Sequence, residues 1–121
     1  MIGIVATADV LVDTDVLIGH LRGKHRLSGR GRSLGVSVIS RYELFAGRDE
    51  HERLRAFLRP MTELPINPAI AELAGVTRRE SGIQVPDALI AATALAHGIP
   101  VMTRNRRRFA RVAGLRVIAP D

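Results

Sequence analysis

The sequence predicts an α/β fold in which a parallel sheet is covered by helices. Short apolar segments alternate with helical ones along the chain, and each apolar segment is only a few residues long. Strands of that kind are typical of a sheet that is buried on both faces. With 121 residues the chain has the length of a single domain, which we expect to span residues 1–121.

The predicted elements follow one another in regular order. Strands are predicted at residues 10–12, 35–39, 62–66, 100–102 and 115–118. Helices are predicted at residues 16–21, 40–47, 51–58, 68–81 and 86–96, with a helical turn at 105–109. Residues 24–33 are basic and contain glycine, so we expect an exposed loop there.

The charge balance favours a polyanionic partner. The chain has 18 Lys and Arg against 12 Asp and Glu, a net charge of +6, and Lys24 is the only lysine. A guanidinium grips phosphate through paired hydrogen bonds, although a bias toward arginine also follows from genomic base composition. With 1 Tyr and 3 Phe, a base-stacking platform is disfavoured. RNA would therefore bind mainly through its phosphates.

Several other classes of protein are disfavoured by the composition. Without cysteine, disulfides and thiolate metal sites are excluded, as suits a reducing cytosol. No apolar stretch approaches the ~20 residues that a membrane helix needs. Residues 1–8 lack the basic and long apolar segments of a signal peptide. We therefore expect a cytoplasmic protein that does not associate with a membrane.

Three carboxylates follow predicted strands or begin a predicted helix. Asp13 comes directly after the first strand, Glu43 lies one turn beyond the second, and Asp87 is at a helix start. In parallel α/β sheets the active site lies beyond the carboxyl ends of the strands. The three side chains are therefore candidates for a single site.

Each carboxylate also has a purely structural interpretation. Asp87 is the only formally charged side chain in residues 81–103 and shares a stripe with apolar residues, but it would also interact with the positive end of its helix. Asp13 has the place of a helix N-cap. Glu43 completes the sequence SRYE at residues 40–43, which matches a capping box that starts at Ser40.

Taken together, the carboxylates predict a magnesium site. Three of them at one sheet edge repel one another unless a divalent cation neutralises them. Mg²⁺ takes oxygen ligands and keeps several waters, so Asp13 and Asp87, with Glu43 as ligand or water orienter, would suffice. Such an ion can activate a water against an RNA phosphodiester. The scattered histidines give no zinc pattern.

A polar and basic segment follows the fourth predicted strand. Thr103 can donate a hydrogen bond to a carboxylate or a phosphate, and Asn105 can orient a metal-bound water or, equally, cap the next turn. Arg104 and Arg106 belong to a basic run of a kind that is usually a solvated surface. Its place beside the predicted site makes these arginines candidates for substrate contact.

Four segments of the sequence resemble the motifs of PIN domains. VLVDTDVLI at 10–18 is similar to the opening of that family, ISRYEL at 39–44 to its second acidic motif, PDALIAATAL at 86–95 to its third, and MTRN at 102–105, through Phe109, to its last. The four occur in family order. Length and motif style are most similar to the VapC-type toxins of bacterial type II toxin–antitoxin pairs.

The resemblance implies a three-layer α/β/α sandwich with a mostly five-stranded parallel sheet. It implies an endoribonuclease that depends on Mg²⁺ or Mn²⁺, a homodimer, and inhibition by a cognate antitoxin, with which a hetero-oligomer would form. By position, Asp13, Glu43 and Asp87 would bind the metal, and Asn105 would be the fourth polar residue of the catalytic set.

One departure from the family bears on the metal site. Many relatives carry an acid at the position of Asn105 or directly before Phe109, where this chain has Arg108. No fourth carboxylate is offered there, although Asp15 lies two residues from Asp13. A one-metal mechanism is therefore favoured.

Two other functions fit parts of the pattern. The missing acid and the capping box leave room for a module that binds RNA or a protein without cutting. A receiver or an aspartate-based phosphatase also pairs acids after a first strand, but residues 64–67 supply no phosphoacceptor aspartate after the third. The nuclease and the binding module are therefore the hypotheses to be compared.

Overall fold

A computed structural model describes residues 7–120 of the chain. Within this range, five parallel strands form one sheet in the order β3-β2-β1-β4-β5. The strands are β1 (Val10–Val12), β2 (Leu34–Ser37), β3 (Thr62–Leu64), β4 (Val101–Met102) and β5 (Val117–Ile118). The predicted parallel sheet is confirmed, and its strand order reverses between β1 and β4.

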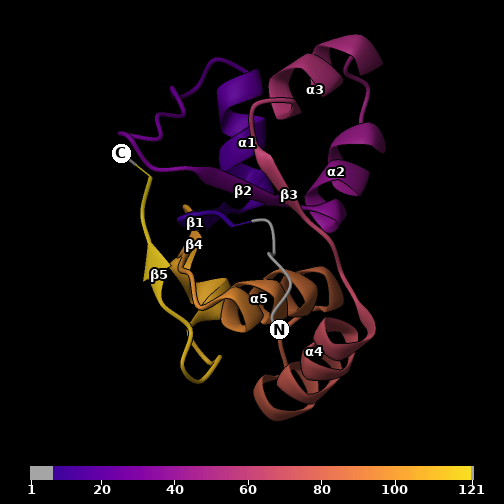
Figure 1. Cartoon of the computed structure of the whole chain (residues 1–121), viewed down its shortest axis with the longest axis vertical. Helices are drawn as coiled ribbons and strands as arrows, with labels where there is room; N and C mark the ends of the chain where they lie inside the picture. Colours follow the sequence, from indigo (N-terminus) through magenta and orange to yellow (C-terminus); the bar gives the residue numbers. More distant parts are fainter. Residues whose placement is uncertain (1–6, 121) are drawn as a thin grey trace, which may run out of the picture.

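Helices cover both faces of the sheet (Figure 1). They are α1 (Thr14–Leu21), α2 (Val38–Phe45) and α3 (His51–Leu58) on one face, and α4 (Pro68–Ser81) and α5 (Val85–His97) on the other. A short 3₁₀ turn, η1 (Arg106–Phe109), follows β4. The arrangement confirms the predicted α/β/α sandwich.

Strand β1 lies between the two hydrophobic cores. All of its side chains are fully buried. Leu11 packs with α4 and α5, whereas Val10 and Val12 pack with α1 and α3. Because successive side chains of a strand point to opposite faces, this short strand serves both layers. It also fixes the next residue, Asp13, at the carboxyl edge of the sheet.

Helix α2 begins at Val38 rather than at Ser40, and β2 ends at Ser37 rather than at Ile39. The Ser37 hydroxyl oxygen caps the helix by accepting a hydrogen bond from the Ile39 amide at 3.0 Å. This cap outweighs the preference of the β-branched Val38 and Ile39 for a strand. The predicted boundary between strand and helix is therefore wrong by two residues.

The start of α4 and the ends of α4 and α5 follow the capping rules. The Asn67 side chain accepts a hydrogen bond from the Ile70 amide at 2.8 Å, and Pro68 occupies the first turn of α4. Gly82 and Gly98 follow the two helices with φ of 75° and 65°, a conformation that glycine adopts without strain. The predicted spans of both helices hold to within about one residue.

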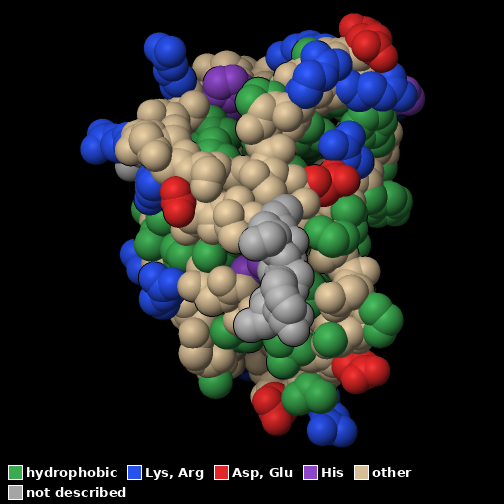
Figure 2. Space-filling view, viewed as in Figure 1, with side chains coloured by type: hydrophobic (Ala, Val, Ile, Leu, Met, Phe, Trp, Pro, Cys, Tyr) green, Lys and Arg blue, Asp and Glu red, His purple; other side chains and the backbone are tan. Residues whose placement is uncertain are grey.

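Positive charge is spread over the surface. Figure 2 shows Lys and Arg side chains over α3 and down the side where β5 lies. On and beside α3, Arg53 pairs with Asp49 at 3.0 Å and Arg55 with Glu52 at 2.5 Å. Exposed pairs of this kind contribute ~0–1 kcal/mol each. Net charge alone therefore does not locate a functional site.

Three further expectations concern residues 24–33, membrane-spanning helices and residues 1–8. Residues 24–33 contain neither helix nor strand, as predicted for a loop. None of the helices in residues 7–120 is long and apolar enough to span a bilayer. The expectation that residues 1–8 are not a signal peptide falls mainly on residues 1–6, outside the described residues.

Candidate active site

The candidate site lies where the strand order reverses. Asp13 follows β1, and Thr103 follows the neighbouring strand β4. The Asp13 amide donates to the Met102 carbonyl at 2.9 Å, and the Thr103 hydroxyl donates to Asp13 Oδ2 at 2.8 Å. These bonds join residues from the first and last sequence motifs at the carboxyl edge, where α/β sheets bind their ligands.

Asp13 acts both as a helix cap and as a member of the site. Its Oδ1 accepts from the Thr14 amide at 2.9 Å, which caps α1. Its Oδ2 faces the opposite way, toward Thr103 and Arg108. The carboxylate is 0% exposed, so the charge is stabilised by hydrogen bonds and a guanidinium rather than by water. The prediction that Asp13 is a helix N-cap is confirmed, and its role as a metal ligand stays a prediction.

Glu43 is not part of a capping box, and that interpretation of Ser40 is wrong. Because α2 begins after Ser37, Ser40 lies inside the helix and is fully buried. The Thr14 hydroxyl donates to Glu43 Oε1 at 2.6 Å and lies 2.8 Å from the Ser40 hydroxyl. A hydroxyl has one proton, so Ser40 donates to Thr14, which in turn donates to the carboxylate. The chain of hydroxyls aims Glu43 toward the start of α1.

Asp87 occupies the first turn of α5 and is 7% exposed. Burial, the largest cause, and the negative charges of Glu43 and Asp15 together raise its pKa to about 6. The influence of these two carboxylates places all three in one electrostatic cluster. Asp87 Oδ1 accepts from Arg108 Nη1 at 3.0 Å. The isolated charge of this apolar helix therefore has the partner that its burial requires.

Asp15 is a fourth carboxylate near the edge of the cluster. Its Oδ2 lies 3.5 Å from the Thr103 hydroxyl and 3.8 Å from Arg108 Nη2. Burial raises its pKa, partly offset by hydrogen bonding from the Arg104 backbone. Its Oδ1 is buried and has no hydrogen-bond partner among the described residues. This oxygen is an open acceptor beside the other carboxylates.

Arg108 is the central residue that sequence reasoning missed. Nη2 pairs with Asp13 and Nη1 with Asp87, and Nη2 also lies 3.3 Å from the Thr103 hydroxyl. One usable signal was its position directly before Phe109, a buried anchor of η1. A residue beside that anchor is held close to the end of β4. Thr14 and Ser40 were missed as well, since nothing local distinguishes their hydroxyls.

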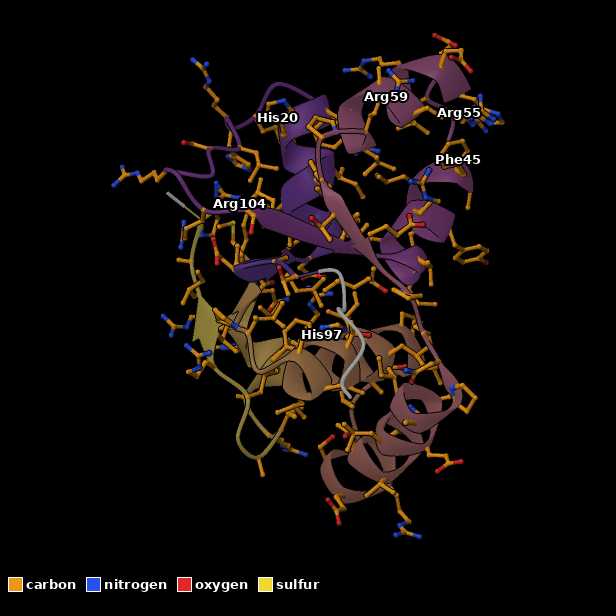
Figure 3. All side chains as sticks on the ribbon, in the orientation of Figure 1. His20, Phe45, Arg55, Arg59, His97 and Arg104 are labelled. Carbon is orange, nitrogen blue, oxygen red and sulfur yellow. The ribbon has the colours of Figure 1, made fainter. Side chains whose placement is uncertain are left out.

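The remaining residues of the last motif lie around the edge of the cluster. The Asn105 backbone amide donates to the Thr103 hydroxyl at 3.1 Å, while its side chain is exposed and does not cap η1. Arg106 donates to the Val117 carbonyl at 3.0 Å, toward β5 and not toward the carboxylates. Arg104 is exposed, acts electrostatically on Asp15, and lies on the α1 side of the sheet (Figure 3).

A pocket of about 240 Å³ opens beside Asp87. It is lined by residues 81–84 before α5 and by the basic side chains Arg107, Arg108 and Arg111. Its size and charge suit an anionic group such as a phosphate. The pocket is next to the carboxylate cluster on the side of Asp87. A chain of phosphate groups could therefore contact the pocket and the cluster at once.

The side chains of the site offer the donor atoms that a divalent cation requires. Asp13, Glu43 and Asp87 offer carboxylate oxygens, the ligands that Mg²⁺ prefers, and burial together with the charges of Glu43 and Asp15 raises the pKa of Asp87. As arranged in residues 7–120, no three acidic or histidine side chains form a ready metal cage. Oxygens of Asp13 and Asp87 face Arg108 instead. The carboxylates fit a divalent metal ion, but the Arg108 guanidinium pairs with two of them.

The fold and the site together define a class: α/β proteins with an acidic centre at the switch point of a parallel sheet. The PIN domain family matches residues 10–115. The chain belongs to the PIN-domain family.

Individual relatives agree with this family and with the VapC-type resemblance. The chain is 33% identical over 113 residues to Ribonuclease VapC19 of Mycobacterium tuberculosis, covering 82% of this chain and 90% of the relative. A toxin–antitoxin complex from Klebsiella pneumoniae contains a similar chain at 30% identity and a TM-score of 0.77, covering 93% of this chain and 98% of that one. A chain of DNA-bound VapBC from Salmonella typhimurium superposes with a TM-score of 0.82 and is 22% identical, covering 93% of this chain and 98% of that one. At this identity the similarity is one of fold.

Proposed function

We propose that this chain is an Mg²⁺-dependent endoribonuclease, with Mn²⁺ as an alternative ion, and the toxin of a VapBC-type pair. The observation that carries the proposal is the cluster of Asp13, Glu43 and Asp87 at the switch point, beside a pocket lined by arginines. The relative named Ribonuclease VapC19 supports the activity.

Asp13, Asp87 and Glu43 would hold the ion, which supplies a bound water of lowered pKa and neutralises charge on the phosphodiester. The chain's own residues do the rest. Thr103 fixes the orientation of Asp13, and the Thr14 hydroxyl fixes that of Glu43. Each carboxylate is thereby held in place before substrate arrives, which reduces the reorganisation that catalysis requires.

Basic side chains near the cluster would position the RNA backbone. Arg107 and Arg111 line the pocket beside Asp87, and Arg104 lies beside Asp15 on the other side. Thr103 and Arg104 remain proposed substrate contacts. Arg106 is a weaker candidate, because its guanidinium is engaged with the Val117 carbonyl. Asn105, exposed at the rim, remains the proposed fourth polar residue.

The proposed partners are RNA, a second copy of this chain and a cognate antitoxin. Solved relatives described as a toxin–antitoxin complex and as VapBC support the antitoxin. Val76 of α4 and Val85 of α5 are 40% and 52% exposed, which provides apolar surface for a homodimer. An RNA substrate would place the activity in the cytoplasm.

The test is cleavage of a defined RNA by the purified chain, without its partner, in Mg²⁺ and in EDTA. We expect cleavage in Mg²⁺ alone, and a loss of roughly a hundredfold or more in Asp13→Asn and Asp87→Asn. Asp49→Asn removes an exposed carboxylate far from the site and should retain activity. Full activity in both site variants, or equal cleavage in EDTA, would overturn the proposal.

One observation favours the binding module as a second candidate. Arg108 already supplies a cation to Asp13 and Asp87, so the cluster is partly neutral without a metal. A binding module would retain RNA in EDTA and leave it uncut in Mg²⁺ and Mn²⁺. The same preparation therefore distinguishes the two functions.

A further inference from the structure

Arg108 bridges the two carboxylates best placed to bind a metal. Its Nη2 pairs with Asp13 Oδ2 and its Nη1 donates to Asp87 Oδ1 at 3.0 Å. Asp13 follows β1 and Asp87 lies in the first turn of α5, so a single guanidinium connects two elements at the switch point. The pairing is partly buried, because the Arg108 side chain is 33% exposed and those of Asp13 and Asp87 are 1% and 10% exposed.

A divalent ion and this guanidinium need the same oxygens. Oδ2 of Asp13 already accepts from Thr103 as well as from Arg108, and its Oδ1 caps α1. No oxygen of Asp13 is therefore left without a partner. An ion that binds Oδ2 must displace one of its two hydrogen-bond donors, and Arg108 is the one that carries a positive charge.

The contacts of Arg108 indicate that its side chain can leave the cluster. Its buried Nε has no hydrogen-bond partner among the described residues, so the guanidinium is incompletely satisfied where it lies. Its one-third exposure gives it a path to solvent. The same side chain lines the pocket beside Asp87, which provides space for an alternative position.

We propose that Arg108 is an internal counter-ion that competes with the metal for Asp13 and Asp87, and that it thereby sets the metal affinity of the site. This inference rests on the proposed metal-dependent function. In the metal-free protein Arg108 neutralises the carboxylates. When the ion binds, Arg108 moves off them and its charge becomes available to an anionic ligand in the adjoining pocket.

The test is a titration of the purified full chain with Mn²⁺, followed by the electron paramagnetic resonance signal of the free ion. Arg108→Gln removes the competing charge, and Arg107→Gln is the matched control, because Arg107 lines the same pocket without pairing with a carboxylate in residues 7–120. We expect Arg108→Gln to bind Mn²⁺ about tenfold or more tightly than the parent. Arg107→Gln should differ from the parent by no more than about twofold.

A second measurement does not depend on metal binding by the parent. In EDTA, Arg108→Gln should lower the midpoint of thermal unfolding relative to Arg107→Gln, because the buried carboxylates lose their counter-ion. Added Mn²⁺ should then raise the midpoint more in Arg108→Gln than in either other protein. Arg108→Lys, which keeps the charge but cannot span both carboxylates, should bind Mn²⁺ with intermediate affinity.

The outcomes separate this inference from the proposed function. Equal tightening in Arg108→Gln and Arg107→Gln, or none in either while the parent binds Mn²⁺, would overturn the role of Arg108 and leave the metal site intact. If neither the parent nor Arg108→Gln binds Mn²⁺, both proposals fail. If Arg108→Gln binds Mn²⁺ tightly while the parent cuts no RNA, the counter-ion stands and the nuclease fails.

Discussion

The acidic cluster has two halves that are stabilised in different ways. In the inner half, Asp13 and Asp87 are nearly inaccessible to solvent and share the guanidinium of Arg108. In the outer half, Glu43 and Asp15 are half-buried; Glu43 accepts a hydrogen bond from the Thr14 hydroxyl. Buried carboxylates need a cation, whereas partly hydrated ones can be held by neutral donors.

The difference assigns separate tasks to the halves. The inner half is where a cation is required for stability, so it should dominate metal affinity. In the outer half Asp15 Oδ2 lies 3.8 Å from Arg108 Nη2, farther than the oxygens of the inner half, and Asp15 Oδ1 is an open acceptor. The outer half should therefore contribute to charge and orientation around the reacting phosphate. Three experiments sharpen or break this comparison.

Removing the charge of Glu43 should have the largest effect. Glu43→Gln keeps the bond from Thr14 but loses the negative charge, and we expect cleavage to fall by about 10–100-fold. The measurement is kcat/KM on a fluorogenic RNA in Mg²⁺. Glu63→Gln, which alters a partly exposed carboxylate paired with Arg41, is the control. Full activity in Glu43→Gln would show that the charge of Glu43 is not needed for cleavage.

Acidification should weaken Mn²⁺ binding through the inner half. An ordinary aspartate is ionised at pH 5, but Asp87 has a pKa of about 6 and takes up a proton there. Because a metal ligand must be ionised, the affinity should fall by about tenfold between about pH 8 and about pH 5. In Glu43→Gln the midpoint should move to lower pH, since one charge that raises the pKa is gone. A flat profile would contradict the assignment of Asp87.

Deleting a hydroxyl from each half should have the smallest effect. Thr103→Val removes the donor to fully buried Asp13, and Thr14→Val removes the donor to half-buried Glu43. We expect both to destabilise the metal-free protein by roughly 1–3 kcal/mol, with the larger loss in Thr103→Val. Urea unfolding in EDTA measures both. A larger loss in Thr14→Val would contradict the expectation that the hydrogen bond to the more buried carboxylate contributes more to stability.

Local patterns in the sequence predicted most of the fold. Helix α4 was predicted to its ends because Pro68 and Gly82 mark a helix start and stop in their own right. Asp87 was identified because a single charge in an apolar helix is visible without any tertiary information. The start of α2 was misplaced, because Ser40 was taken as the N-cap, whereas Ser37 caps the helix and Ser40 is buried within it.

The partners of the site residues were not predictable in the same way. Arg108 and Asp13 are 95 positions apart, and Thr14 and Glu43 are 29 apart. Such contacts depend on the direction in which η1 and α2 leave their strands, which no local pattern determines. The sequence shows that the last motif has Arg108 where many relatives carry an acid. That Arg108 pairs with Asp13 and Asp87 became visible only in the three-dimensional structure.

The hydrogen bond between Thr103 and Asp13 also has a consequence for synthesis on the ribosome. It spans 90 positions of the chain, and β4, which carries Thr103, is paired directly with β1 at the centre of the sheet. A nascent chain that has emerged only as far as α5 contains all four carboxylates but neither β4 nor the guanidinium. At a synthesis rate of about 5–20 residues per second, that interval is brief. The centre can therefore be assembled only after β4 and η1 have left the ribosome.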